Sequence, residues 1–211
     1  MVDLDNIIAY FARHGTTKLN SSNCFRGNVD VPLDDKGIRD AHQLADVLRP
    51  IDFCLIACSE KQRARVTADI INKGRKIPIH SAPNLNALNV GDFSGLPRNE
   101  ENTNELQYYI DNPEITIPGG ESLNDFKARV QPCFAEIAEI AQNTGVPVLI
   151  VAHSSIIHEL GSVLHGNHTQ VLVQPGGVTA MYMKDSGDLS AEPIFKPVAK
   201  QTGERQADTV S

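Results

Sequence analysis

The chain has 211 residues, of which 41% are hydrophobic and 21% are charged, a composition typical of a globular protein in water. The net charge is −7 and the sequence holds no basic block, which argues against nucleic acid or an anionic membrane as the main partner. No run approaches the roughly 20 apolar residues that span a bilayer, and the first residues lack the positive charge that opens a signal peptide.

Short apolar runs alternate along the chain with segments of helical periodicity, the pattern of an α/β protein. The expected strands cover residues 7–12, 53–58, 77–81, 148–152 and 179–183. The expected helices cover 37–48, 60–72, 100–110, 123–142 and 155–164. We predict one domain over residues 1–198, followed by a polar, flexible tail over 199–211.

The first strand leads directly into Arg13, His14 and Gly15. Histidine is the side chain whose ordinary pKa leaves it a neutral nucleophile or base near pH 7. The adjacent guanidinium is permanently charged and planar, which suits it to a phosphate group held by two hydrogen bonds. The tripeptide therefore indicates a phosphate site at the end of this strand.

The second helix opens with Ser59-Glu60-Lys61-Gln62, which fits a capping box. This places Arg63 in the first turns of the helix, where free backbone N–H groups already favour an anion. Proline and glycine residues between 113 and 120 predict a loop.

Arg13-His14-Gly15 begins the first of five sequence motifs, each with a characteristic spacing of its residues. The motifs lie at residues 13–37, 59–68, 85–95, 118–122 and 151–154. Their residues resemble the histidine phosphatase superfamily, which includes cofactor-dependent phosphoglycerate mutases and many small phosphatases. The resemblance covers most of the chain. It implies a phosphoglycerate mutase-like α/β fold, with a mostly parallel central sheet flanked by helices on both faces.

The resemblance also implies roles for individual residues. His14 is expected to accept the phosphoryl group, in a pocket formed by Arg13, Arg63 and His153. Asn20, Gly27 and Ser154 are expected to line the substrate site. Because cationic donors stabilise the charge of the transferred group, no metal ion or cofactor is expected.

One position departs from the family pattern. Relatives usually carry a glutamate two residues after Leu85, where it protonates the leaving oxygen, but this chain has Ala87. Such acid–base help is worth on the order of 10²- to 10⁴-fold in rate. Three interpretations stay open: substrates with good leaving groups, a replacement acid (Asp92 or Glu121), or binding of phosphorylated ligands without turnover.

Two further departures concern arginines. Arg26 precedes Gly27 where relatives often have glutamine, and we expect it either to reach a second anionic group of the substrate or to be a solvated loop residue. Mutases of this family carry a longer segment with an arginine pair, whereas residues 96–118 here contain only Arg98. The resemblance therefore favours a phosphatase over a mutase, with a small cap over an open pocket.

Competing enzyme classes fit the sequence less well. A cysteine-based phosphatase needs five residues between cysteine and arginine, but Cys58 and Arg63 have four between them. A serine esterase built on Ser154 would need a glycine where Ile156 stands. We expect a phosphatase acting on phosphate monoesters or other phosphorylated small molecules, located in the cytoplasm with reduced cysteines. It binds neither nucleic acid nor membrane, and a homodimer is compatible with the sequence.

Overall fold

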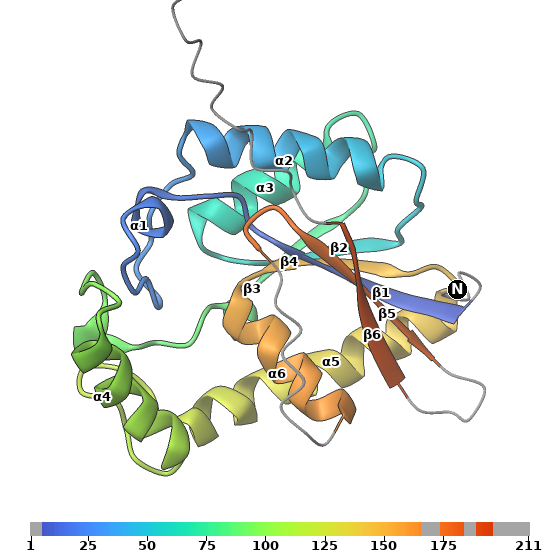
Figure 1. Cartoon of the computed structure of the whole chain (residues 1–211). Coiled ribbons are helices and arrows are strands. Elements are labelled where there is room, and N and C mark those ends of the chain that lie inside the picture. Colours follow the sequence, from blue (N-terminus) through green and yellow to red (C-terminus); the bar gives the residue numbers. More distant parts are fainter. Residues whose placement is uncertain (1–5, 166–173, 184–188, 196–211) are drawn as a thin grey trace, which may run out of the picture.

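In the computed structural model, which describes residues 6–165, 174–183 and 189–195, six strands form one sheet in the order β3-β2-β4-β1-β5-β6 (Figure 1). Strands β3, β2, β4 and β1 are parallel, β5 is antiparallel to β1, and β6 is antiparallel to β5. The strands are β1 (Ile7–Arg13), β2 (Leu55–Ser59), β3 (Ile79–Ala82), β4 (Val148–Ala152), β5 (Val178–Met183) and β6 (Leu189–Phe195). The predicted α/β class with a mostly parallel sheet is confirmed.

Helices cover both faces of this sheet (Figure 1). Side chains of a strand alternate between the faces, and β1 shows this alternation directly. Tyr10 and Ala12 pack against α2 (Asp35–Leu48) and α3 (Gln62–Asn72), while Ala9 and Phe11 pack toward α5 (Leu123–Thr144) and α6 (Ser154–His165). Two apolar cores therefore hold β1 and β4 rigidly at the centre of the molecule.

The remaining helical segments lie in the connections at one end of the sheet. They are α1 (Lys18–Ser21), α4 (Glu100–Asp111) and two 3₁₀ turns, Pro83–Leu85 and Gly91–Phe93. Helix α4 packs its partly buried Leu106 and Ile110 against the core on the side of α5. The predicted loop at 113–120 is present between α4 and α5.

The structure corrects several sequence-based boundaries. Helix α3 begins at Gln62, and its N-cap, Lys61, makes no side-chain capping bond, so the predicted capping box is wrong. Ser59 instead ends β2. Helix α2 begins two residues before the predicted start, because the Asp34 carboxylate accepts a hydrogen bond from the Gly37 N–H at 2.8 Å. The sequence reading also missed β6, and the predicted tail at 199–211 lies outside the described residues.

No helix in the described ranges is both long enough and apolar enough to cross a membrane. All four cysteines are free thiols.

Candidate active site

Three of the predicted residues meet at the carboxyl edge of the sheet. His14 follows β1, His153 follows β4, and Arg63 lies in the first turn of α3, directly after β2. Because these strands are parallel neighbours, their carboxyl ends lie side by side, which is where open α/β sheets bind ligands. The ring centroids of His14 and His153 are 5.1 Å apart.

The hydrogen bonding of His14 fixes which nitrogen can react. Its Nδ1 atom is 2.6 Å from the Gly15 carbonyl oxygen, and a carbonyl only accepts, so Nδ1 carries the proton. Nε2 is buried without a hydrogen-bond partner in the described part of the chain. Burial first, and then the charges of His153, Arg26 and other arginines, hold the pKa of His14 well below its usual value. His14 is therefore neutral near pH 7, with its lone pair on Nε2.

The turn that carries His14 is held by close backbone packing. A Cβ atom at Gly15 would lie 2.2 Å from the Gly37 carbonyl oxygen, so only glycine fits. The Gly15 N–H donates to Thr67 Oγ1 at 3.2 Å, and that hydroxyl donates to the Arg63 carbonyl at 2.7 Å. Thr67 thus links the His14 turn to α3.

Arg63 is 1% exposed and is oriented by two backbone carbonyls. Its Nη1 donates to the Val29 oxygen at 2.7 Å and its Nη2 donates to the Gly27 oxygen at 3.1 Å, while Nε is buried without a partner in the described residues. Gly27 has a φ of +50°, which favours glycine and turns its carbonyl toward the guanidinium. Burial lowers the pKa of Arg63 to about 10, opposed by Asp30, so the side chain stays charged at neutral pH.

His153 is positioned by a network that the sequence did not reveal. Its Nε2 is 2.8 Å from Ser59 Oγ, and the Ser59 hydroxyl donates to Asn86 Oδ1 at 2.7 Å. Asn86 Oδ1 also accepts from the Glu60 N–H at 3.1 Å, which fixes the orientation of the amide. Because the Ser59 proton is used, His153 Nε2 is the donor in their bond.

The remaining nitrogen of His153, Nδ1, is buried without a partner in the described residues. Burial, followed by the charge of Arg63, keeps the pKa of His153 well below its usual value. A phosphate dianion placed beside Nδ1 would raise that pKa, since a nearby negative charge favours the protonated ring. His153 can then donate to a phosphate oxygen from Nδ1.

Arg26 is buried, at 7% exposure, which rules out the solvated loop residue that the sequence left open. It donates from Nη1 to Asn20 Oδ1, an oxygen that also accepts from the Thr17 N–H and hydroxyl at 3.1 Å each. Asn20 does not line the cavity described below, and its side-chain oxygen contacts Arg26 and Thr17 instead. Burial, and then the charge of Arg13, lowers the pKa of Arg26 to about 9.

Arg13 completes the charged cluster. Burial, followed by the charges of Arg98 and Arg63, lowers the pKa of Arg13 to about 10. Both Arg13 and Arg26 therefore remain protonated at neutral pH. The resulting positive field at the edge of the sheet attracts an anion.

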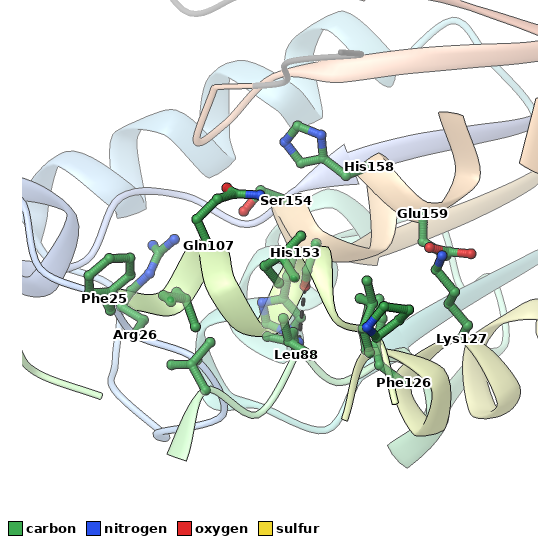
Figure 2. Close-up of a pocket in the computed structure, with 18 of the residues that line it drawn as sticks. Phe25, Arg26, Leu88, Gln107, Phe126, Lys127, His153, Ser154, His158 and Glu159 are labelled. Atoms are coloured by element: carbon green, nitrogen blue, oxygen red, sulfur yellow. Dashed lines mark hydrogen bonds between the residues drawn. The ribbon is translucent and has the colours of Figure 1, made fainter. Parts of the chain in front are cut away.

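A cavity of about 860 Å³ opens beside this cluster, lined by Arg26, Arg63 and His153 but not by His14 or Arg13. Figure 2 shows Phe25 and Arg26 on one side of it and Phe126 and Lys127 on the other, with His153 between them. Other lining residues include Gly27, Arg63, Ala87, Arg98 and Ser154. The predicted substrate-binding residues Gly27 and Ser154 thus line it, as does the alanine at the expected acid position.

Neither candidate replacement acid lines the cavity. The Glu121 carboxylate pairs with Arg129 at 2.7 Å and accepts from the Asn89 N–H at 2.8 Å, so it holds the loop before α5. Asp92 is exposed and its carboxylate lies against Gly119. The structure offers no carboxylate from these two positions to the cavity.

The buried neutral histidines have a consequence for stability. In the unfolded chain, His14 and His153 take up protons near pH 6.5, whereas in the folded chain their lowered pKa values prevent this. Between pH 6.5 and the lowered values, the unfolded state binds more protons, so stability falls as pH decreases. We expect a loss of up to about 1.4 kcal/mol per pH unit for each histidine in the free energy of unfolding.

Urea unfolding between pH 7 and pH 5 measures this slope. In His14→Gln, the free energy of unfolding should depend less on pH, because one buried histidine is removed. His42→Gln, on the exposed surface of α2, is the control and should keep the pH dependence of the wild type. A wild-type stability that stays constant over this range would contradict the neutral state of both rings.

Together, these observations define an α/β protein with two buried histidines and several arginines at the carboxyl edge of its sheet. Residues 9–185 match the model of the histidine phosphatase superfamily, branch 1, and the chain belongs to that family.

Relatives show the range of activities in the family. The adenosylcobalamin/alpha-ribazole phosphatase of Escherichia coli is 28% identical over 161 residues, covering 74% of this chain and 78% of that protein. The 2,3-bisphosphoglycerate-dependent phosphoglycerate mutase of Cytophaga hutchinsonii is 35% identical over 159 residues, covering 72% and 75%. The structure of Bacillus stearothermophilus YhfR superposes with a TM-score of 0.75 at 26% identity, covering 90% of this chain and 97% of that one. The activity class is therefore that of a phosphatase or a mutase-like enzyme.

Proposed function

We propose that this protein is a phosphatase that transfers a phosphoryl group from a small-molecule substrate to Nε2 of His14 and then to water. The observation that carries the proposal is the state of His14. Its Nδ1 proton is committed to the Gly15 carbonyl, and its Nε2 lone pair is buried beside His153 and the arginines. Neutral imidazole with a free nitrogen is the form that attacks phosphorus.

In the first step, the Nε2 lone pair forms a bond to phosphorus, and the bond from phosphorus to the leaving oxygen breaks with its electron pair on that oxygen. Arg13, Arg63 and protonated His153 would stabilise the charge on the phosphoryl oxygens. In the second step, water adds to phosphorus, the electron pair of the P–N bond returns to Nε2, and one water proton passes to solvent.

The alanine at position 87 determines which substrates can react. The first step leaves an oxygen anion that no side chain at that position can protonate. A phenolate, whose conjugate acid has a pKa of about 10, leaves far more readily than an alkoxide, whose conjugate acid is as weak an acid as water. We therefore propose a phosphatase for good leaving groups.

An assay with an aryl phosphate and a simple alkyl phosphate tests this function. Hydrolysis of the aryl ester at a rate at least about 10²-fold above that of the alkyl ester, lost in His14→Ala, would support it. Hydrolysis of neither ester, with retained binding of inorganic phosphate, would overturn it in favour of a phosphate-binding protein. Loss of activity in Ser154→Ala but not in His14→Ala would instead support the serine esterase.

Asp92 provides a separate prediction. Because its side chain lies outside the cavity, Asp92→Asn should leave kcat for both esters within about twofold of the wild type, as is usual for an exposed polar substitution. Steady-state kinetics on the two esters measures this. A selective loss of alkyl phosphate hydrolysis would show that Asp92 replaces the missing acid.

A further inference from the structure

The cavity holds cationic side chains beyond those assigned to the transferred phosphoryl group. A phosphate monoester carries a charge of about −1.5 to −2 at pH 7. Arg26, Arg63 and Arg98 all line the cavity, and the charge of Arg98 acts on both Arg13 and Arg26. The carboxylate acting on Arg63 is Asp30. Two acidic side chains, Asp111 and Glu159, also line the cavity. Arg26 and Arg98 are cations that the proposed transfer to His14 does not use.

Arg26 and Arg98 both contact neutral side chains at the wall of the cavity. The Cζ atom of Arg98 lies over the Phe25 ring, 4.4 Å from its centroid, in a cation–π contact at the cavity wall. The Nε atom of Arg26 is buried without a hydrogen-bond partner in the described residues. Both side chains are fixed by neutral partners, Phe25 and Asn20, which compensate none of their charge.

The alanine at position 87 lines the same cavity as these two arginines. An enzyme without a proton donor at this position can still assist departure if fixed cations stabilise the charge that develops on the leaving oxygen. Stabilisation by fixed cations is suited to a leaving group that is itself an anion, because cations attract its negative charge. A phosphate leaving group, with a second pKa of about 6, departs without needing a proton at neutral pH.

From these two features we infer that the preferred substrate is a phosphoanhydride, whose terminal phosphoryl group goes to His14 while Arg26 and Arg98 hold the second phosphate as the leaving group. This inference rests on the proposed function of His14. It makes Arg26 and Arg98 a second anion subsite specific to the leaving side of the reaction.

The step balances without a further reactant. The Nε2 lone pair of His14 bonds to the terminal phosphorus, and the bond from that phosphorus to the bridging oxygen breaks. The bridging oxygen keeps the electron pair and leaves as part of the second phosphate. Water then releases orthophosphate from His14, with one proton passing to solvent.

Three substrates distinguish this subsite from the phosphatase activity itself: inorganic pyrophosphate, an aryl phosphate and a simple alkyl phosphate. The assays contain a chelator, so that pyrophosphate is presented as the free anion. We expect kcat/KM for pyrophosphate to exceed that for the alkyl phosphate by at least about 10²-fold, with both activities lost in His14→Ala.

Arg98→Gln is the decisive variant, because it keeps a polar side chain and removes one cation. It should lower kcat/KM for pyrophosphate roughly 10- to 100-fold, the value of one charge-assisted hydrogen bond, and change that for the aryl phosphate by less than about threefold. Arg26→Gln should show a loss of the same kind. Arg39→Gln, on the exposed surface of α2, is the matched control and should change neither.

The outcomes separate the two proposals. Hydrolysis of the aryl phosphate without hydrolysis of pyrophosphate would overturn the phosphoanhydride inference and leave the phosphatase intact. An equal loss on both substrates in Arg98→Gln would overturn the leaving-group subsite. Hydrolysis of neither substrate by the wild type would overturn the proposed function as well.

Discussion

His14→Ala should lower kcat for aryl phosphate hydrolysis by about 10⁴-fold or more, the scale on which removal of a nucleophile acts. The reason is that Nε2 of His14 is the atom we expect to bond to phosphorus, and water cannot replace it in the first step. Arg63 and His153 remain in the variant, so binding of inorganic phosphate should persist. Steady-state kinetics together with phosphate titration measures both quantities.

His42→Ala is the matched control for this prediction. His42 is also a histidine, but it is exposed on α2, and its removal should leave kcat within about twofold of the wild type. Thermal unfolding of both variants verifies that they are folded. A His14→Ala protein that keeps more than about a tenth of the wild-type rate would contradict a nucleophilic role.

Ala87→Glu should raise kcat for a simple alkyl phosphate by about 10²-fold, the lower end of the range for general acid–base catalysis. Ala87 lines the cavity with 7% of its surface exposed, so a longer side chain extends into open space. The new carboxyl group would protonate the leaving alkoxide. The aryl phosphate needs little protonation, so its rate should change by less than about threefold.

Ala87→Gln controls for the size and polarity of the new side chain. Glutamine has nearly the same shape as glutamate but carries no acidic proton, so it should not accelerate alkyl phosphate hydrolysis. Equal gains from glutamate and glutamine would show that the effect is not proton transfer. An unchanged alkyl rate in Ala87→Glu would contradict the interpretation of position 87 as the vacant acid position.

The sequence predicted the centre of the fold because local patterns and tertiary packing agree there. The apolar run of β1 is buried on both faces of the sheet, and the histidine that follows it lies at the predicted edge. Strand β6 was missed because its residues include Glu192 and Pro193, which are uncommon inside strands. As an edge strand β6 tolerates proline, which a central strand would not.

Ser59 shows how a local motif can mislead. The residues after it satisfy the capping-box pattern, but β2 continues through Ser59 and directs its hydroxyl to His153 and Asn86. The pairing of β2 with β4 brings Ser59 beside His153, and the pairing of β2 with β3 brings the segment of Asn86 to the same edge. Neither pairing is encoded locally. In the sequence, the only indication that Asn86 belongs to the site was its position directly before Ala87, within the motif at residues 85–95.

The positions of the Asp92 and Arg98 side chains also could not be predicted from the sequence. Asp92 is the acid nearest to Ala87 in the sequence, but the 3₁₀ turn Gly91–Phe93 places its carboxylate against Gly119. Arg98 belongs to a connection without periodicity, and its stacking on Phe25 depends on contacts between segments far apart in the chain. Distance along the chain says little about which side chains share a cavity.

Trapping of a phosphorylated enzyme tests the central claim most directly. The wild type is mixed with an aryl phosphate, quenched in alkali, in which phosphohistidine survives, and analysed by mass spectrometry of its peptides. We predict one added phosphoryl group, located on His14, and none in His14→Ala. Turnover without any phosphorylated His14, or with the label on another residue, would contradict the account.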